Sequence, residues 1–391
     1  MSTASAEKTP MSALTGTLRG GSGQRLRGMI RKEFLQIRRD PSSIAIAFLL
    51  PVVLLLLFGY GVSLDAKHVP IALVVEQPGA ETASFIDKFQ HTEYFQPVLL
   101  HSMAVAEQAL RARQVNGIVR LRADFAKALK NADDAPIQVI VNGVDANTAR
   151  LVQGYVQGVW ALWLTQQAAA RGMALTIPVA LEQRVWFNAE LRSRDFLVPG
   201  LIAVIMTLIG ALLTAMIMAR EWERGTMEAL LVTPVAMREI LLGKLIPYFI
   251  LGMGGMALSV VMARWLFDVP LRGSWWLLVI AAALFLLVAL GMGLLISIVA
   301  RSQFVAGQVA IIVTFLPAFL LSGFIFDIGS MPGVVQAITH LVPARYFVAI
   351  LQTLFLAGNV WSVLLPNALA LLIMAGLFLG LARHKARKRL D

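Results

Sequence analysis

Long apolar runs alternate with short polar stretches along most of this chain. Each of six such runs, of roughly 20 residues, is long enough for a helix to cross about 30 Å of hydrocarbon. The six runs cover 43–64, 197–219, 240–263, 275–300, 304–326 and 361–381. Charged side chains are nearly absent inside them, and one such residue at the bilayer centre costs at least about 2.5 kcal/mol. The pattern therefore predicts six transmembrane helices.

A seventh apolar run, 341–357, is shorter and contains Pro343 and Arg345. This composition favours a segment that re-enters the membrane or lies on it over a segment that crosses it. We therefore expect 327–360 to form a re-entrant segment on the outer side. The expected fold is an α-helical polytopic membrane protein with six spans plus this segment.

The interval 65–195 has ordinary polarity and separates the first two predicted spans. Its β-branched runs predict strands and its amphipathic runs predict helices. The strands cover 71–75, 117–121 and 137–141, and the helices cover 80–90, 103–114 and 123–130. A long helix from Asp145 to about Arg171 and a β-like stretch at 176–188 follow. The interval therefore predicts a small α/β or α+β domain inserted into the membrane protein.

Composition agrees with a membrane protein. The chain is 58% hydrophobic and 15% charged, whereas soluble domains carry about 25% charged residues. An ordinary soluble enzyme is therefore excluded. The chain has no cysteine, which excludes disulfides, a thiol nucleophile and thiolate metal sites. The inserted domain has no HExxH or GxSxG motif, and its carboxylates are scattered without a spacing typical of a catalytic pair, which favours a binding or docking role over catalysis.

The net charge of +11 is concentrated at the two ends of the chain. Residues 1–42 hold eight basic against three acidic residues, and 383–391 hold five against one. The inserted domain, 65–195, is balanced at thirteen of each. Basic flanks next to apolar spans follow the positive-inside bias, so we expect both termini in the cytoplasm and the inserted domain outside. A nucleic-acid partner is not expected, because the soluble domain carries no basic excess.

The amino-terminal flank has two parts. Residues 1–23 are rich in Ser, Thr and Gly and predict a disordered cytoplasmic leader. Residues 24–40 place Leu26, Ile30, Phe34 and Ile37 at helical spacing among basic residues. They predict a basic amphipathic helix on the inner leaflet, in contact with membrane lipids; a merely solvated leader is the alternative. At the other end, 382–391 is expected to be a basic cytoplasmic tail.

A charged segment, 220–239, leaves the second span and enters the third as a short hairpin. Its glycine allows a sharp turn, and its Thr-Pro pair is a good helix start. A short helix on such a hairpin could be pushed by a partner outside the bilayer and pass that movement on to the two spans. The alternative is an ordinary charged loop that connects them. The candidate coupling residues are Arg220, Glu221, Glu223, Arg224, Gly225, Thr226, Glu228, Thr233 and Pro234.

The run from Arg220 to Lys244, R-E-x-E-R-G-T-x-E-x-L followed by T-P, E and G-K, resembles the permeases of ABC-2 type exporters. The stretch RSRDFLVPG at 192–200 resembles the start of that family's second span, and Ala189 departs from the proline expected there. The closest likeness is to the multidrug-export branch, which carries a large periplasmic domain between spans one and two. Outer-segment motifs of the family are matched around Pro317, Ser322, Gly323, Pro343, Arg345 and Tyr346.

The resemblance implies a mechanism and partners. The hairpin would dock on an ABC ATPase subunit that binds ATP and Mg²⁺, because this chain has no GxxxxGK[ST] motif and is expected to bind no cofactor. A second permease chain, identical or related, would complete the transporter, and Gly376 and Gly380 could pack within or between subunits. The family further implies a bacterial inner membrane and a possible periplasmic adaptor protein.

Drugs or other amphipathic compounds are the expected cargo. The spans lack the carboxylates that proton- or sodium-coupled carriers use, and their methionines offer an adaptable lining. A sodium or lipid-linked-polymer exporter is the alternative within the class. A membrane-anchored sensor or scaffold without transport is the alternative outside it. The polar span residues Ser259, Ser297, Thr314 and Ser322 are expected either to bond their own backbone or to face cargo.

Overall fold

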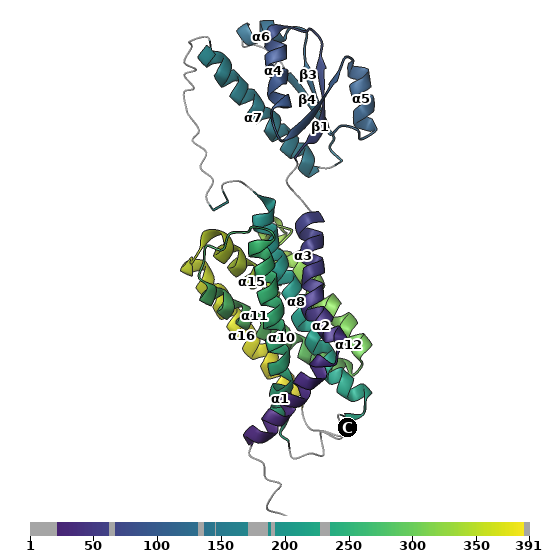
Figure 1. Cartoon of the computed structure of the whole chain (residues 1–391), viewed down its shortest axis with the longest axis vertical. Helices are drawn as coiled ribbons and strands as arrows, with labels where there is room; N and C mark the ends of the chain where they lie inside the picture. Colours follow the sequence, from purple (N-terminus) through teal and green to yellow (C-terminus); the bar gives the residue numbers. More distant parts are fainter. Residues whose placement is uncertain are drawn as a thin grey trace, which may run out of the picture. The chain divides into compact units, whose positions relative to one another are not determined.

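The computed structural model describes residues 22–61, 67–131, 137–144, 146–170, 187–188, 192–226 and 235–386. These residues form two compact units (Figure 1). The helical unit comprises the described residues up to 61 and from 187 onward, and the α/β unit comprises those between Leu64 and Arg184. The predicted leader, apart from its last two residues, and most of the β-like stretch lie outside the described residues.

The helical unit contains six helices that are long and apolar enough to cross a membrane. Three of them are uninterrupted α-helices in the middle of the chain: α8 (Ser193–Glu223), α10 (Met237–Trp265) and α11 (Trp275–Ala300). The last is α16 (Trp361–Lys385). These six confirm the predicted polytopic helical fold.

The other two spans are assembled from short helices joined through π-helical turns. The first runs through α2 (Pro41–Ile44), a π turn at Ala45–Leu49 and α3 (Leu50–Gly61). The fifth runs through α12 (Gln303–Ala310), a π turn at Ile311–Phe315 and α13 (Leu316–Leu321). It ends five residues before the predicted boundary at 326, because Gly323 takes a left-handed φ of 82° that an α-helix cannot continue through.

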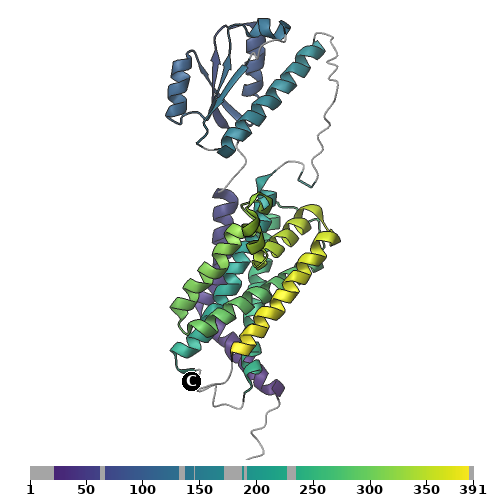
Figure 2. The ribbon, with the colours of Figure 1, turned by 180° about the vertical axis from the view of Figure 1, so that it is seen from behind.

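Helix α8 forms the centre of the bundle. Its side chains from Val198 to Leu208 are all buried, and it packs closely on α11. A Cβ built at Gly210 would lie 2.6 Å from the Cβ of Ala289, so the two backbones approach as only small residues allow. Helix α16 lies along one side of the bundle, yellow in Figure 2, and leaves most of its apolar surface uncovered by this chain.

The segment predicted to re-enter the membrane forms two helices at a sharp angle. After a 3₁₀ turn at Ile328–Ser330, α14 (Gly333–Thr339) is followed by α15 (Pro343–Gln352) and a π turn at Thr353–Ala357. The two arms bend by 84° at the break between them. Proline at the first position of α15 starts that helix afresh. A bent pair of this kind is compatible with the predicted re-entrant segment.

The α/β unit is built on a mixed four-stranded sheet in the order β2-β1-β3-β4. Strand β1 (Val69–Val75) pairs in parallel with β2 (Phe95–Leu100) and β3 (Gly117–Leu121), while β4 (Ile137–Val141) is antiparallel to β3. The helices are α4 (Ala80–Gln90), α5 (Met103–Arg111), α6 (Phe125–Asn131) and α7 (Ala146–Ala170). Because α4 and α5 connect parallel strands, the unit is of the α/β type.

The sequence pattern missed β2, which contains Pro97. Proline cannot donate to a strand ladder, so it is found at sheet edges, and β2 occupies an edge of this sheet.

The core of the α/β unit is aromatic. The Phe85 ring meets the rings of Phe89 and Trp163 edge-on, and Trp163 Nε1 donates to Ser84 Oγ at 3.1 Å. Helix α7 therefore covers the same sheet face as α4.

Candidate functional site: a buried charge cluster at the ends of the helices

The charged motif begins inside α8 rather than after it. Arg220, Glu221 and Glu223 occupy the last turn, and Arg224 caps the helix. Gly225 follows with φ of 66°, the left-handed conformation that ends helices at glycine. The hydroxyl of Thr226 then turns back to donate to Glu221. The motif therefore ends a span, and most of its charges point toward neighbouring helices.

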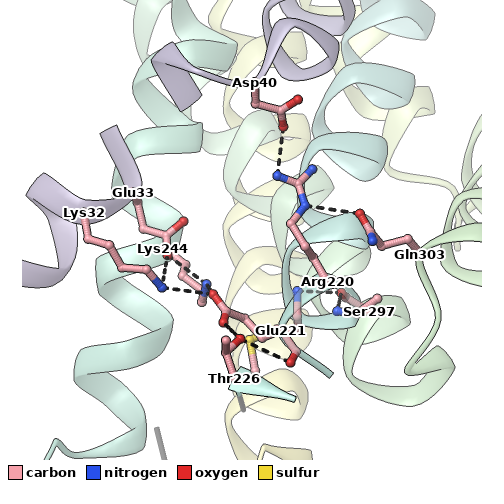
Figure 3. Close-up of polar contacts among 11 residues, drawn as sticks. Lys32, Glu33, Asp40, Arg220, Glu221, Thr226, Lys244, Ser297 and Gln303 are labelled. Carbon is pink, nitrogen blue, oxygen red and sulfur yellow. Dashed lines mark hydrogen bonds and ion pairs between the residues drawn. The ribbon is translucent and has the colours of Figure 1, made fainter. Parts of the chain in front are cut away.

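Glu221 lies inside the protein, paired with a lysine of the next span. The Nζ of Lys244, on α10, donates to Glu221 Oε1 and to Glu33 Oε1, each at 2.8 Å (Figure 3). Glu33 belongs to α1 (Ser22–Arg38). The exposed fractions of Glu33, Lys244 and Glu221 are 0%, 1% and 5%. One ammonium thus joins two consecutive spans, α8 and α10, to helix α1, whose Glu33 lies 211 residues away in sequence.

The pairing explains how these charges are tolerated in the interior. Buried ions require partners because desolvation costs several kcal/mol per ion. Lys32, at the cluster's edge, places its Nζ 3.1 Å from Glu221 Oε1 and so supplies a second positive charge. Two carboxylates and two ammonium groups therefore balance. We call Lys32, Glu33, Glu221 and Lys244 the charge cluster.

Arg220 extends these contacts to the first and fifth spans. Its Nη1 donates to Asp40 Oδ2 at 2.8 Å, and its Nε donates to Gln303 Oε1 at 3.2 Å. Burial opposes ionisation of Asp40, but hydrogen bonds from Ser42, Ser43 and Arg220 outweigh it and lower the pKa of Asp40 to about 2. Asp40 also caps α2. It is therefore a carboxylate at neutral pH and holds the α1–α2 corner against the end of α8.

Glu223 fastens the end of α8 to the start of α12. Its Oε1 accepts from the backbone N–H of Gln303 at 2.8 Å and from Ser302 Oγ at 3.1 Å, and its Oε2 accepts from Gln303 Nε2. A carboxylate at these positions satisfies free amide groups at a helix amino terminus. The Arg301 guanidinium also lies over the Trp222 ring, 4.8 Å from its centre. Glu223 is thus a helix-capping group for a different helix.

The starts of α1 and α10 are joined in the same way. Glu239 accepts from the backbone N–H of Ala236 at 2.8 Å and from Ser22 Oγ, and Arg25 Nη2 approaches it at 3.4 Å. A Cβ built at Gly243 would lie 2.8 Å from Met29 Cβ, so α1 and α10 touch closely. Helix α1 is therefore packed on the bundle along its length.

Ser297 makes the polar contact that joins α8 and α11. Its Oγ accepts from the backbone N–H groups of Met218 and Ala219, both at 2.9 Å. Ser259 and Thr314 instead donate to carbonyl groups one turn back in their own helices. Of these three side chains in the described spans, only Ser297 bonds across helices, and its partner Met218 lies one helical turn before Glu221.

The predicted outer residues fall into two groups. Arg345 Nη1 donates to Thr339 and to the Gln336 carbonyl at 3.4 Å, and Tyr346 Oη donates to the His340 carbonyl at 2.9 Å. These bonds hold the α14–α15 corner, which Pro343 begins on its α15 side. The second group surrounds the end of α13: Pro317 lies in that helix, Ser322 Oγ accepts from the Phe324 N–H at 3.3 Å, and Gly323 makes the turn.

Three predicted coupling residues, Glu228, Thr233 and Pro234, lie outside the described residues. Conversely, sequence reasoning did not assign site roles to Glu33, Asp40 or Gln303. Glu33 carried a signal that could have been used. It lies one helical turn from Ile37, on the apolar stripe of a basic helix. Burying a carboxylate on such a stripe costs free energy unless a cation pairs with it.

Six apolar helices, two of which (α8 and α10) are joined at their charged ends by a buried ion pair, define a polytopic helical membrane protein. The sequence model of the ABC-2 family transporter protein matches residues 41–383. The chain therefore belongs to the ABC-2 transporter family. It is the permease subunit of an exporter, and ATP hydrolysis belongs to a separate ABC ATPase subunit.

Similar proteins are found in Escherichia coli K12. The chain is 45% identical over 371 residues to the probable multidrug ABC transporter permease YbhS, which covers 95% of this chain and 98% of that protein. It is 30% identical over 347 residues to the probable multidrug ABC transporter permease YbhR, with 88% and 94% covered. The inner membrane transport permease YhhJ is 27% identical over 323 residues, with 82% and 85% covered.

Proposed function

We propose that this permease exports drugs or other amphipathic compounds across a bacterial inner membrane. The names of its E. coli relatives support this cargo and location. The interior of α8, from Val198 to Ala219, carries no ionisable side chain, which suits an apolar or amphipathic cargo better than an ion. On this proposal ATP and Mg²⁺ bind the partner subunit.

The proposed orientation follows from the positive charges. Arg and Lys residues of α1 and of the end of α16 would lie in the cytoplasm under the positive-inside bias. Because six spans separate these two ends, the α/β unit would then lie on the periplasmic side. Its edge strand β2 exposes Val98 and Leu99 by 42% and 49%, which supports binding of a periplasmic adaptor protein. Loss of adaptor crosslinking when 65–195 is deleted would support that role, and retention would contradict it.

The charge cluster carries the proposed coupling mechanism. Lys244 Nζ holds Glu33 and Glu221 at 2.8 Å each, so α1, α8 and α10 meet at one buried point. The hairpin 220–239 connects α8 to α10. A push by the ATPase subunit on the hairpin would therefore move these three helices together rather than bend the loop alone.

Cargo export is tested in proteoliposomes that contain this chain with its ATPase subunit. Ethidium serves as the amphipathic probe, and its ATP-dependent movement is followed by fluorescence. We expect movement only when both subunits, ATP and Mg²⁺ are present. Uphill movement with this chain alone would contradict an ATP-driven mechanism, and export of sodium or of a lipid-linked polymer in place of ethidium would contradict the proposed cargo.

The common movement of α1 and α10 is tested with a reversible crosslink. The chain contains no cysteine, so the pair Met29→Cys and Gly243→Cys is unique. A Cβ at Gly243 lies 2.8 Å from Met29 Cβ, so a shift of roughly 1 Å between the two helices brings the pair into the Cβ–Cβ range of a disulfide, about 3.5–4.5 Å. If the two helices move as one, ATP-driven export continues after oxidation at the rate measured for the reduced protein. Export that stops on oxidation and resumes on reduction would show that α1 must separate from α10, which contradicts the proposal.

A further inference from the structure

A basic cavity of about 850 Å³ lies beside the charge cluster. It opens between α1, the start of α2, the end of α8 and the start of α12. Asp40 is the only carboxylate among its described lining residues. The cationic lining residues are Arg31, Lys32, Arg39, Arg220 and Arg224. The cavity therefore has a strong positive excess and is suited to an anion.

Part of this positive charge is already compensated inside the protein. Lys32 pairs with Glu221, and Arg220 pairs with Asp40. In the part of the chain that the structure describes, no carboxylate lies within ion-pair distance of Arg31, Arg39 or Arg224. All three side chains are exposed. Three guanidinium groups from the α1 region and the end of α8 thus border one cavity without an ion-pair partner among the described residues.

An apolar groove of about 660 Å³ adjoins the basic cavity, and the two share Arg31 and Leu35. The groove runs between α1, the first span and α10. It is lined by Phe34, Leu35, Ile37, Ile44, Phe48 and Ile250. Phe34 is 40% exposed and Ile250 is 51% exposed. The described chain leaves this groove uncovered, directly next to the cationic residues.

We propose that the cavity and the groove together bind one anionic phospholipid, with its phosphate among the guanidinium groups and an acyl chain in the groove. Arginine binds phosphate oxygens in a bidentate manner. Free phosphate or a nucleotide would use the basic cavity and leave the apolar groove empty. An amphiphilic anion would occupy both the basic cavity and the apolar groove. The cavity also lies at the end of α8 and the start of α12, and span ends are where lipid headgroups contact a membrane protein.

The bound lipid would reinforce the contact between α1 and the bundle. Arg31 and Arg39 belong to α1 and its carboxyl-terminal end, while Arg224 caps α8. A phosphate shared by these residues would therefore join the same two helices that Glu33, Lys244 and Glu221 join from inside. Lipid binding in this place requires neither ATP nor the ATPase subunit.

The test measures lipid binding to the full-length protein in detergent by native mass spectrometry. The probes are phosphatidylglycerol and phosphatidylcholine with the same acyl chains. The cavity variant is Arg31→Gln with Arg39→Gln and Arg224→Gln. The control, Arg27→Gln with Arg238→Gln and Arg383→Gln, removes three exposed charges that line neither cavity nor groove.

We expect wild type to prefer phosphatidylglycerol, and the cavity variant to lose at least about tenfold in affinity for it, because each basic residue near anionic lipid contributes favourably. The control should keep the preference. Ile250→Trp, which fills the groove, should weaken phosphatidylglycerol binding without removing any charge. This binding assay contains no ATPase, so a failure of the export proposal would leave its result unaffected.

Four results would overturn the proposal. Equal loss in the control variant would assign the preference to diffuse surface charge. Competition by inorganic phosphate as strong as that by the lipid would make the cavity a site for a free anion. Unchanged affinity in Ile250→Trp would exclude the acyl chain from the groove. Unchanged affinity for phosphatidylglycerol in the cavity variant would exclude the three guanidinium groups from the lipid site.

Discussion

The Nζ of Lys244 lies 2.8 Å from Glu33 Oε1, although 211 residues separate them in the chain. Both side chains are essentially inaccessible to solvent. The contact ties an amino-terminal helix, which precedes the first span, to the third span. Helix α1 is therefore part of the folded bundle and contributes a buried charge to it.

Removing only the lysine should be strongly destabilising. Lys244→Met leaves Glu33 and Glu221 buried with Lys32 as their remaining cation. Loss of one partner from a buried ion pair costs roughly 3–5 kcal/mol. We expect a lower melting temperature in detergent, measured by tryptophan fluorescence.

Neutralising the three buried members of the charge cluster should recover most of that loss. The variant Glu33→Gln with Glu221→Gln and Lys244→Met has no uncompensated buried charge at these positions. Its melting temperature should lie between that of Lys244→Met and wild type. If the triple variant is less stable than the single variant, the buried ions contribute net stability as a group and the balance described here is wrong.

The contact between Asp40 and Arg220 should be insensitive to pH in the physiological range. The folded-state pKa of Asp40 is about 2, below its unfolded value of about 3.9. A lowered carboxyl pKa adds stability that is complete above the unfolded pKa and is lost as the pH falls toward 2. Asp40→Asn should therefore lower the melting temperature by the same amount at pH 6, 7 and 8. A difference that changes across this range would contradict the assignment.

Two buried serines should respond differently to the same substitution. Ser297→Ala removes the acceptor of two amide groups of α8, and such loss costs about 1–3 kcal/mol. Ser259→Ala removes only a bond to its own helix and should cost about 1 kcal/mol or less. Thermal unfolding of the two variants under identical conditions checks the order. Equal losses would show that the bond between α8 and α11 adds nothing specific.

The close contact between α1 and α10 predicts a steric effect. Gly243→Ala adds a methyl group 2.8 Å from Met29 Cβ, and overpacking costs about 1–3 kcal/mol. The matched control is Gly28→Ala on α1, where no atom lies within 4 Å of the new Cβ. That change should stabilise the protein slightly, because alanine favours helices by up to about 1 kcal/mol. A stabilised Gly243→Ala would indicate that the helices are less tightly packed than described.

The spans could be predicted from sequence because their signal is local. The fourth predicted span, 275–300, coincides with α11, since Trp275 and Arg301 bound an uninterrupted apolar run. In the α/β unit the predicted helix 80–90 coincides with α4, and two of the predicted strands, 117–121 and 137–141, coincide with β3 and β4. Strand β2 was missed because Pro97 weakens its local pattern, whereas its position at the sheet edge depends on the whole fold.

The site could be predicted only in part. The motif around Arg220 and Glu221 was identified, but its partners were not, because Glu33, Asp40 and Gln303 come from segments far away in the sequence. Charges next to a span are usually assigned to the surface. Glu221 is instead 5% exposed, since Lys244 lies close enough to make its burial possible. Such pairings depend on tertiary packing, which a hydropathy pattern does not contain.

The 211-residue separation between Glu33 and Lys244 also sets an order of events during synthesis. At about 5–20 residues per second the ribosome needs roughly 10–40 s to reach the lysine after it has added the glutamate. Throughout that interval Glu33 has no lysine at 244 to bind and keeps its hydration. The contact between α1 and α10 can therefore form only after the third span has been made, although α1 is synthesised before that span.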